Sequence, residues 1–474
     1  MKTRNIKRAA VLASLCAAFV SQSTLSGADE ASDLRQLKAE VAAERKALSE
    51  ERAALADQRR RIDEALLSLQ DQSVEPKPSD SSRSLPPVGA PQATEAKPGP
   101  HLDVYGFIQA DSIYDFNRVD PAWNATLRAS KIPVTCPGDA GCGRDGETVF
   151  SVRQSRLGFN GFIPTAAGDI KTKFEFDLFG VGADAGNTTM RVRHIWGELG
   201  HWGAGQTNSV FMDGDLFPNT IDYWGPVGMV FLRNPQIRWT PVQDENWKLA
   251  FAIEAPGAGI DSGKVAQIDP SFAASPWNKY PDVTGMVRFN DSWGHLQFSA
   301  LLRSLGVEGT TGTGDQFHRR VFGWGLNIGN VLEVGSLIES LKGDQLISGI
   351  VYGYGIANYM NDGGNDVAPD ASADAAAVPT LGWLVYYNRT WNERWTSSFG
   401  YSQHQQFNVG GQSAASFAEG DYANVNVLWH PVPEMFVGPE FIWGKRKNND
   451  SNGGSDSRVQ VSFHYDFGGR IGPR

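Results

Sequence analysis

Cysteine is scarce in this sequence, with three residues in 474. That number is too small for a disulfide-stapled scaffold or for a zinc site built from four thiolates. Basic residues are not in excess either, because 43 Lys and Arg stand against 53 Asp and Glu, for a formal net charge of −10. Nucleic acid is therefore not an expected partner, since its phosphates attract basic surfaces.

Long apolar runs and enzyme motifs are also missing. Beyond residue 28 no run of about 18 apolar residues occurs, so no transmembrane helix is predicted. The eight His show no metal-ligand spacing, and residues 257–265 lack the Gly and Ser/Thr positions of a phosphate-binding loop. An acidic segment with Asp362, Asp366, Asp370 and Asp374 departs from the calcium-loop pattern and is expected to be a solvated loop. The sequence predicts no enzyme, no cofactor and no metal site.

Residues 1–28 have the pattern of an export signal. Four basic residues precede an apolar stretch at 9–20, and small residues at 26–28 offer a cleavage site. Cys16 would leave with this signal, so that only Cys136 and Cys142 remain. Their loop is rich in Gly and Pro, and in an oxidising compartment we expect them to form a disulfide, with two free thiols as the alternative.

A helical segment and a linker are expected next. Residues 31–70 contain neither Gly nor Pro, and apolar residues recur every seventh position from Leu34 to Leu69. This heptad seam predicts a self-associating coiled coil over residues 29–70, although a single solvated helix or disorder before assembly is the alternative. Residues 71–100 are rich in Pro and Ser, which is typical of a semi-rigid linker.

The remaining residues, 101–474, alternate as strands do. Within 170–178, Ile170, Phe174, Phe176 and Leu178 share one face, and the charged residues at 171, 173, 175 and 177 share the other. Such a strand fits either a soluble sandwich or a membrane barrel with a wet lumen. Short connections alternate with long polar ones, which is typical of outer-membrane barrels, and counting strands from Leu102 to Phe467 gives 16.

The predicted fold is therefore all-β, a 16-stranded antiparallel transmembrane β-barrel preceded by an α-helical coiled-coil segment. One longer inner connection, at 329–343, has room for a helical turn. Aromatic residues near strand ends are interpreted as girdles at the membrane interfaces: Trp196, Trp202, Trp293, Trp391, Trp395 and Trp429.

Three stretches resemble DcaP-type porins of Gram-negative outer membranes. They are VYGFIQADSIYDFNRVDPAWNATLRASKIP (104–133), SVRQSRLGFNGFIP (151–164) and FMDGDLFPNTIDYWGPVGMVFLRNPQIRW (211–239). The resemblance implies a homotrimeric pore in the bacterial outer membrane, with its coiled coil in the periplasm and with outer-membrane lipid and lipopolysaccharide around it. It also implies passage of small anions such as dicarboxylates.

A more distant resemblance, to general diffusion porins, implies the residues of a pore constriction. There, arginines on successive strands face an acidic third loop that folds inward. The matching loop is residues 212–228, with Asp213, Asp215 and Asp222, and the wall residues are Arg156, Arg193, Arg233 and Arg238. Residues 191, 288 and 303 are further arginines on polar strand faces.

At three places the sequence departs from the regular alternation or from the porin pattern. Around Arg193 the apolar residues do not all fall on one face of a regular strand, because Val192 suggests one outward face and Ile195 the other. Around Arg233 the outward face must change between even-numbered and odd-numbered positions, and Pro235 suggests a β-bulge there. Phe107 stands where the general-porin ladder has a basic residue, and the chain continues past Phe467, the last aromatic residue.

The predicted function is passive diffusion of small hydrophilic solutes, with a preference for anions. The alternative is a structural envelope protein whose coiled coil sets the distance between outer membrane and cell wall. A phosphate-selective porin is disfavoured, because residues 101–474 carry 28 Lys and Arg against 39 Asp and Glu.

Overall fold

The computed structural model describes residues 99–143, 145–180, 189–268, 273–310, 316–372 and 374–472. The chain divides into two units, Met1–Gln92 and Ala93–Arg474, and the architecture below is that of the second. The expected signal peptide (1–28), the coiled coil (29–70) and nearly all of the linker (71–100) lie outside the described residues.

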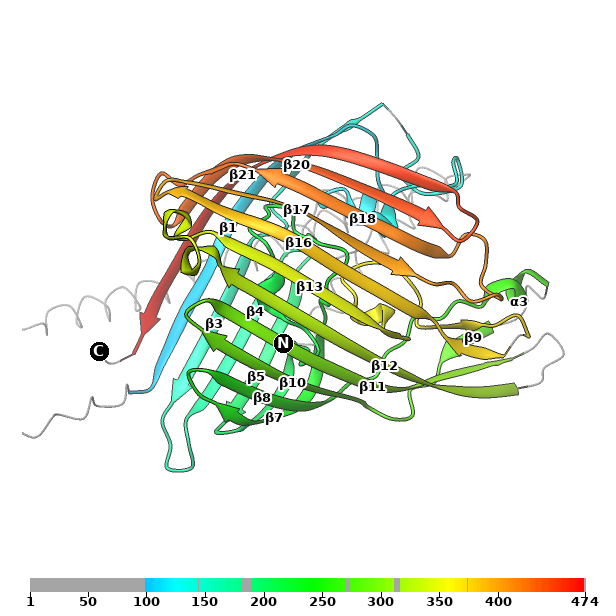
Figure 1. Ribbon diagram of the computed structural model, residues 1–474, viewed down its shortest axis with the longest axis horizontal. Coiled ribbons are helices and arrows are strands. Elements are labelled where there is room, and N and C mark those ends of the chain that lie inside the picture. Colours follow the sequence, from blue (N-terminus) through cyan, green and yellow to red (C-terminus); the bar gives the residue numbers. More distant parts are fainter. Residues whose placement is uncertain are drawn as a thin grey trace, which may run out of the picture. The chain divides into compact units, whose positions relative to one another are not determined.

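Antiparallel strands form a closed barrel (Figure 1). In the described ranges the main sheet has 19 strands, of which β2, β9 and β19 are short additions and the other 16 make the wall. The wall strands are β1 (His101–Asp115), β3 (Arg156–Ile163), β4 (Ile170–Asp177), β5 (Arg191–Leu199), β6 (Trp202–Asn208), β7 (Arg233–Gln243), β8 (Trp247–Glu254), β10 (Asp282–Asp291), β11 (Gly294–Thr310), β12 (Gln316–Glu333), β13 (Gln345–Tyr354), β16 (Pro379–Asn392), β17 (Trp395–Gln406), β18 (Phe417–Asn426), β20 (Met435–Asn448) and β21 (Gly453–Ile471). The 16-stranded antiparallel barrel is thus confirmed.

Polarity across the wall is inverted relative to a soluble protein. Along β11, His295 and Gln297 face inward and are only 4% and 3% exposed, whereas Phe298 and Leu302 face outward and are 47% and 51% exposed. Apolar side chains outside and polar ones inside match a barrel with its outer face in lipid and a wet lumen. The alternation of period two in the sequence has this physical origin.

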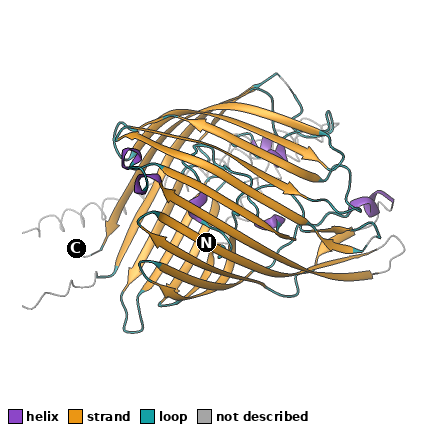
Figure 2. Cartoon of the chain, viewed as in Figure 1, coloured by secondary structure: helices purple, strands orange, loops and turns teal. Residues whose placement is uncertain are grey.

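The remaining elements are short and lie at the strand ends or in the lumen (Figure 2). They are β2 (Glu147–Ser151), β9 (Ala273–Pro276), β14 (Val367–Pro369), β15 (Ala375–Ala377), β19 (Leu428–Trp429), the helix α3 (Gly263–Ile268), and the 3-10 turns η1 (Pro121–Trp123), η2 (Ala129–Lys131), η3 (Gly214–Leu216), η4 (Val334–Ser336), η5 (Glu339–Leu341) and η6 (Ala357–Tyr359). Turns η4 and η5 occupy the inner connection that had room for a helical turn. Among the described residues, no helix is long and apolar enough to cross a bilayer.

The barrel closes between its first and last strands. Strand β21 pairs with β1 from Arg458, opposite Asp115, to Ile471, opposite Leu102. Residues 468–471, which follow Phe467, therefore belong to the strand pair that closes the barrel.

Several local features differ from the sequence expectations or complete them. Trp202 and Trp391 are 59% and 60% exposed on the outer face, but Trp196 is only 7% exposed and does not belong to a girdle. The pairing of β6 with β7 runs through Pro235 without a shift, and the irregularity of β7 lies between Trp239 and Val242 instead. Cys136 and Cys142 are joined by a disulfide.

Candidate pore constriction

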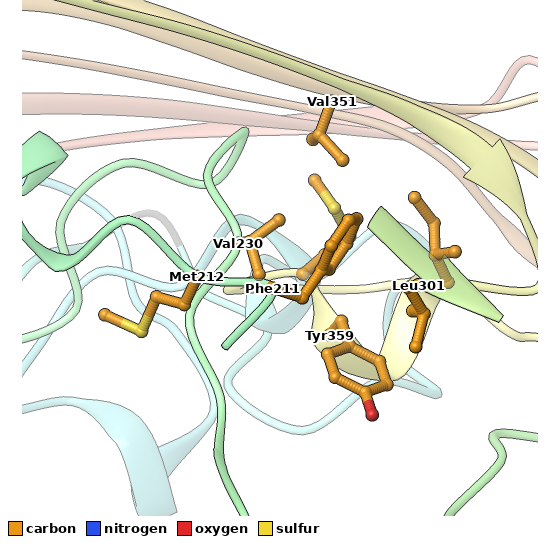
Figure 3. Close-up of a cluster of buried hydrophobic side chains, with 8 residues drawn as sticks. Phe211, Met212, Val230, Leu301, Val351 and Tyr359 are labelled. Atoms are coloured by element: carbon orange, nitrogen blue, oxygen red, sulfur yellow. The ribbon is translucent and has the colours of Figure 1, made fainter. Parts of the chain in front are cut away.

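The third long connection folds into the barrel. Residues 209–232, called the inner loop here, join β6 to β7, and Phe211, Met212 and Val230 of this loop are at most 6% exposed. Figure 3 shows these three side chains beside Leu301 of β11 and Tyr359 of η6. An apolar cluster inside a polar lumen gives the loop a fixed place against the opposite wall, because burial removes its apolar surface from water.

Hydrogen bonds hold the tip of the inner loop to several strands. Its backbone N–H groups at Ile221 and Asp222 donate to Glu440 of β20, at 2.9 and 3.4 Å. The Ile221 carbonyl accepts from the side-chain amides of Gln154 and Gln460, at 2.9 and 3.0 Å. Pairing these buried backbone groups is what allows an irregular segment to cross the barrel interior.

A cavity of about 660 Å³ lies between the inner loop and the wall strands. Its lining carries five cationic side chains, namely Arg156, Lys173, Arg191, Arg193 and Arg233, and two carboxylates, namely Glu175 and Asp222. Arg156, Arg193 and Arg233, which lie on the second, fourth and sixth wall strands, therefore meet at one place. We call this space the arginine cavity.

The carboxylates that pair with these arginines come from β4. Arg193 donates to Glu175 at 2.6 Å and to Asp177 at 3.1 Å, and Arg191 donates to Asp177 at 2.8 Å. The Arg156 Nε lies 3.6 Å from Glu175. Residues Glu175 and Asp177 were not proposed as site residues, although the alternation in 170–178 places both on the polar face of their strand, together with Lys173.

A β-bulge explains the divided phase around Arg193. The register of β4 with β5 passes from Glu175 opposite His194 to Phe176 opposite Val192, so that Arg193 has no directly opposed partner. A bulge places one extra residue on a strand and redirects its side chain. As a result Arg193 and His194 are both buried inside, at 7% and 5% exposed, while Val192 and Ile195 both face outward.

Among the cationic side chains of the cavity, Arg233 is the one that does not lie beside Glu175 or Asp177. Its guanidinium lies 4.8 Å from the ring centroid of Phe231. In the described ranges its Nε is buried without a hydrogen-bond partner. A guanidinium without a carboxylate, in a water-filled space, remains available to a passing anion.

Two of the three aspartates of the inner loop do not face these arginines as expected, whereas the third, Asp222, lines the arginine cavity. Asp215 lies 2.6 Å from Arg288 of β10, and Asp213 lies 2.8 Å from His295 of β11 and 3.5 Å from Arg288. Strands β6, β7 and β8 lie between β5 and β10 in the wall, so the loop places Asp213 and Asp215 beside a different part of the wall from the arginines.

Asp222 has a structural role within the loops. It is 2% exposed and accepts hydrogen bonds from Thr126, from the backbone of Leu127 and from the Tyr422 hydroxyl. Burial raises the pKa of this carboxyl above its ordinary value. Asp222 therefore fastens the inner loop to the first outer loop, and it is the weakest of the three candidates for a charge that acts on solutes.

A second cavity, of about 460 Å³, adjoins the first. Both are lined by Asn208, Met212 and Gly214. Arg238 lines the second cavity, not the first, and its guanidinium lies 5.1 Å from the ring centroid of Trp196. The other charged side chains in this lining are Asp215, Asp244, Lys248 and Arg288.

Among the described residues, Asp213, Asp215 and His295 form a group whose geometry suits a metal ion, because one ligand atom of each lies within 4.8 Å of the others. The guanidinium of Arg288 already lies beside both aspartates. A cationic side chain at this position satisfies the carboxylates and opposes a metal ion by charge repulsion.

Outer-loop residues lock the inner loop in place. The Arg128 guanidinium lies 4.1 and 4.0 Å from the ring centroids of Trp123 and Trp224, and it donates to Asp362 at 2.7 and 3.0 Å. Asp366 likewise pairs with Arg303, at 2.9 Å. The expectation of a solvated acidic loop is therefore wrong for Asp362 and Asp366, which are 2% and 0% exposed because each is paired with an arginine.

Comparisons with known proteins agree with this architecture. Residues 44–275 match the model of the protein family described as DcaP outer membrane protein. No curated protein matches the chain. A crystal structure of the outer membrane channel DcaP of Acinetobacter baumannii superimposes with a TM-score of 0.64 at 20% identity, over 79% of this chain and 99% of that one.

Two further solved structures resemble the barrel at lower similarity. An anion-selective porin from Comamonas acidovorans has a TM-score of 0.47 and 9% identity, over 78% of this chain and 100% of its own. Salmonella typhi OmpF in complex with daunomycin has a TM-score of 0.46 and 12% identity, over 77% of this chain and 97% of its own. The three stretches that carried the resemblance in the sequence all lie within the matched residues 44–275, and through that region this chain is similar to the DcaP outer membrane proteins.

Proposed function

We propose that this protein is a homotrimeric outer-membrane porin that lets small hydrophilic solutes diffuse passively and favours anions, dicarboxylates among them. One observation carries the proposal: five cationic side chains and two carboxylates line the arginine cavity. One of those two carboxylates, Asp222, is buried and engaged in hydrogen bonds.

Arginine suits this role on physical grounds. A guanidinium keeps its charge at every physiological pH, and its planar fork matches a carboxylate with two N–H groups. A wet lumen with low-dielectric walls focuses the field of such charges on a passing ion. Conduction also requires weak binding, and Glu175 and Asp177 limit the positive charge that an anion meets.

The overall acidity of the chain does not oppose anion preference. Exposed charges on outer loops are screened within about 8 Å at physiological salt. Selectivity is therefore decided by the side chains that line the narrow part of the lumen.

The test is the current through purified protein in planar bilayers. We expect conductance in groups of three equal steps, as three pores of one trimer insert together, and a reversal potential in a salt gradient that indicates anion preference. The Arg156→Ala variant should reduce the anion-to-cation permeability ratio by about two- to fivefold at low salt, since screening is weakest there. Arg394→Ala, at an exposed turn, is the matched control and should change nothing.

Absence of any conductance would contradict the channel function and would favour the alternative, in which the barrel only anchors a periplasmic segment. A changed thermal stability with an unchanged reversal potential for Arg156→Ala would assign this arginine a structural role.

A further inference from the structure

Strands β9, β11 and β12 lie side by side at the end of the barrel that carries the long connections (Figure 1). In outer-membrane barrels such connections face the outside of the cell. Toward this end, the outward face of β12 passes from Leu326 through Trp324 and Phe322 to Arg320. Leu326 and Phe322 are 55% and 65% exposed. The apolar outer surface of this strand is therefore followed directly by a cation.

Aromatic residues mark the level at which this apolar surface ends. The ring centroid of Trp324 lies 5.6 Å from that of Tyr354, which in turn lies 5.9 Å from that of Tyr352. Such aromatic groups occupy the headgroup level of a membrane. Arg320 follows Trp324 at the second next outward position, and with the usual rise and tilt of barrel strands it lies roughly 10 Å farther out.

Two cations and two rings form a patch on this outer face, which we call the rim patch: Trp277, Lys279, Tyr280 and Arg320. The Arg320 guanidinium lies 4.8 Å from the ring centroid of Trp277 and 5.0 Å from that of Tyr280. The Lys279 ammonium lies 5.5 and 5.7 Å from the same two centroids. Both cations are exposed and share the same two rings, so they act on one place although they are distant in the sequence.

Gly306 of β11 makes this assembly possible. It lies opposite Arg320 in the pairing of β11 with β12, and its carbonyl accepts a hydrogen bond of 2.9 Å from the N–H of Trp277. A Cβ at this position would lie 2.2 Å from the carbonyl oxygen of Trp277. Glycine therefore permits the close approach of the two backbones, and the ring of Trp277 reaches Arg320 across β11.

Neighbouring carboxylates do not neutralise the rim patch. In the described ranges neither Lys279 nor Arg320 forms an ion pair, and Glu308 of β11 lies 3.6 Å from His318 instead. The rings of the patch carry no formal charge. Two positive charges thus face outward at the level of the headgroups.

We propose that the rim patch binds the phosphate groups of lipopolysaccharide in the outer leaflet. Guanidinium and ammonium groups are the side-chain groups with which proteins bind phosphate. Toward the membrane, Phe322, Leu302 and Val283 on three neighbouring strands are 65%, 51% and 48% exposed and offer apolar surface for the acyl chains of the same molecule. A phosphorylated headgroup above several acyl chains matches the patch in charge and in position. The surface lies outside the lumen, so this inference is independent of the proposed solute preference.

The test is a titration of the detergent-solubilised protein with deep-rough lipopolysaccharide, measured by microscale thermophoresis. The matched probe is the same lipopolysaccharide after its phosphates have been removed with hydrogen fluoride. For the wild-type protein we expect this removal to weaken binding by about ten- to thirtyfold at low salt, because each Lys or Arg near an anionic lipid surface contributes about fivefold.

The variant K279Q/R320Q should bind the phosphorylated probe as weakly as the wild type binds the dephosphorylated one. The matched control is K342Q/R394Q, which also removes one exposed Lys and one exposed Arg, but from short connections at the opposite end of the barrel. Its affinity should equal that of the wild type.

Equal affinity of the wild-type protein for the two probes would overturn the inference, and this comparison needs no variant to fold. An equal loss in K279Q/R320Q and in the control variant would also overturn it, because the effect would then come from net charge. Displacement of the lipopolysaccharide by an equal concentration of phosphatidylglycerol would refute the choice of lipid. Conductance and reversal potential of K279Q/R320Q should match those of the wild type, and a wild-type protein without conductance would refute the proposed function alone.

Discussion

The hydroxyl of Tyr223 donates a hydrogen bond of 2.5 Å to Asp177, across the gap between the inner loop and strand β4. The same hydroxyl accepts from Arg193 at 3.0 Å, and its ring stacks on Phe179 with centroids 3.9 Å apart. One side chain therefore ties the inner loop to the wall that carries the arginines.

Tyr223→Phe should loosen the inner loop without removing any charge. Hydrogen bonds to charged groups are worth about 1.5–3 kcal/mol, so the loss is large enough to let this edge of the loop move. We expect increased open-channel current noise with an unchanged sign of ion selectivity. Tyr465→Phe is the control, since Tyr465 is 48% exposed on the outer face. Noise equal to that of the wild type would mean that the contacts with Glu440 fix the loop by themselves.

Asp215→Ala should increase anion preference. Asp215 has a side-chain exposure of 59% and pairs with Arg288 in the second cavity, so its removal leaves Arg288 with Asp213 as the one carboxylate beside it among the described residues. We expect the anion-to-cation permeability ratio to rise by about twofold at low salt and the effect to shrink as salt screens the charge. Asp291→Ala, at an exposed strand end, serves as the control. A rise of equal size in both variants would show that the effect does not originate in the lumen.

Arg128→Lys should release the outer loops from the inner loop. Lysine lacks the planar guanidinium that lies against both Trp123 and Trp224 and that donates to Asp362 through Nε and a terminal nitrogen, so charge is kept and geometry is lost. We expect faster hydrogen exchange in residues 116–132 and 355–366, with the strands unchanged. Arg118→Lys, at an ion pair of two exposed side chains, should have little effect because such pairs contribute about 0–1 kcal/mol. Unchanged exchange in Arg128→Lys would mean that Asp222 holds these loops without it.

Removal of residues 29–100 should leave a folded, conducting barrel. The first wall strand begins at His101, and its pairs with β21 begin at Leu102. We expect the truncated protein to keep its resistance to unfolding in detergent and its conductance in bilayers. Failure to insert or to trimerise would make this segment an assembly element.

The barrel itself could be predicted from the sequence. Alternation of period two decides which side chains of a strand share a face, and alternation of short and long connections decides that neighbouring strands are antiparallel. Both patterns are local, which is why the 16 strands could be predicted without coordinates, whereas the inward folding of the loop was expected only from the resemblance to porins. The faces of Glu175 and Asp177 followed from the same alternation.

Only the tertiary structure shows which arginines pair with Glu175 and Asp177. Strand register and bulges depend on pairing between residues distant in sequence, so the divided phase at Arg193 was explained only by the bulge opposite Glu175 and Phe176. Likewise, Asp213, Asp215 and Asp222 belong to the loop that enters the lumen, but the path of the loop decides that two of them lie beside Arg288. The third accepts hydrogen bonds from Thr126, Leu127 and Tyr422. Periodicity fixes the face of a side chain along its own strand, whereas the opposing charge is set by how the closed sheet brings distant strands and the loop together.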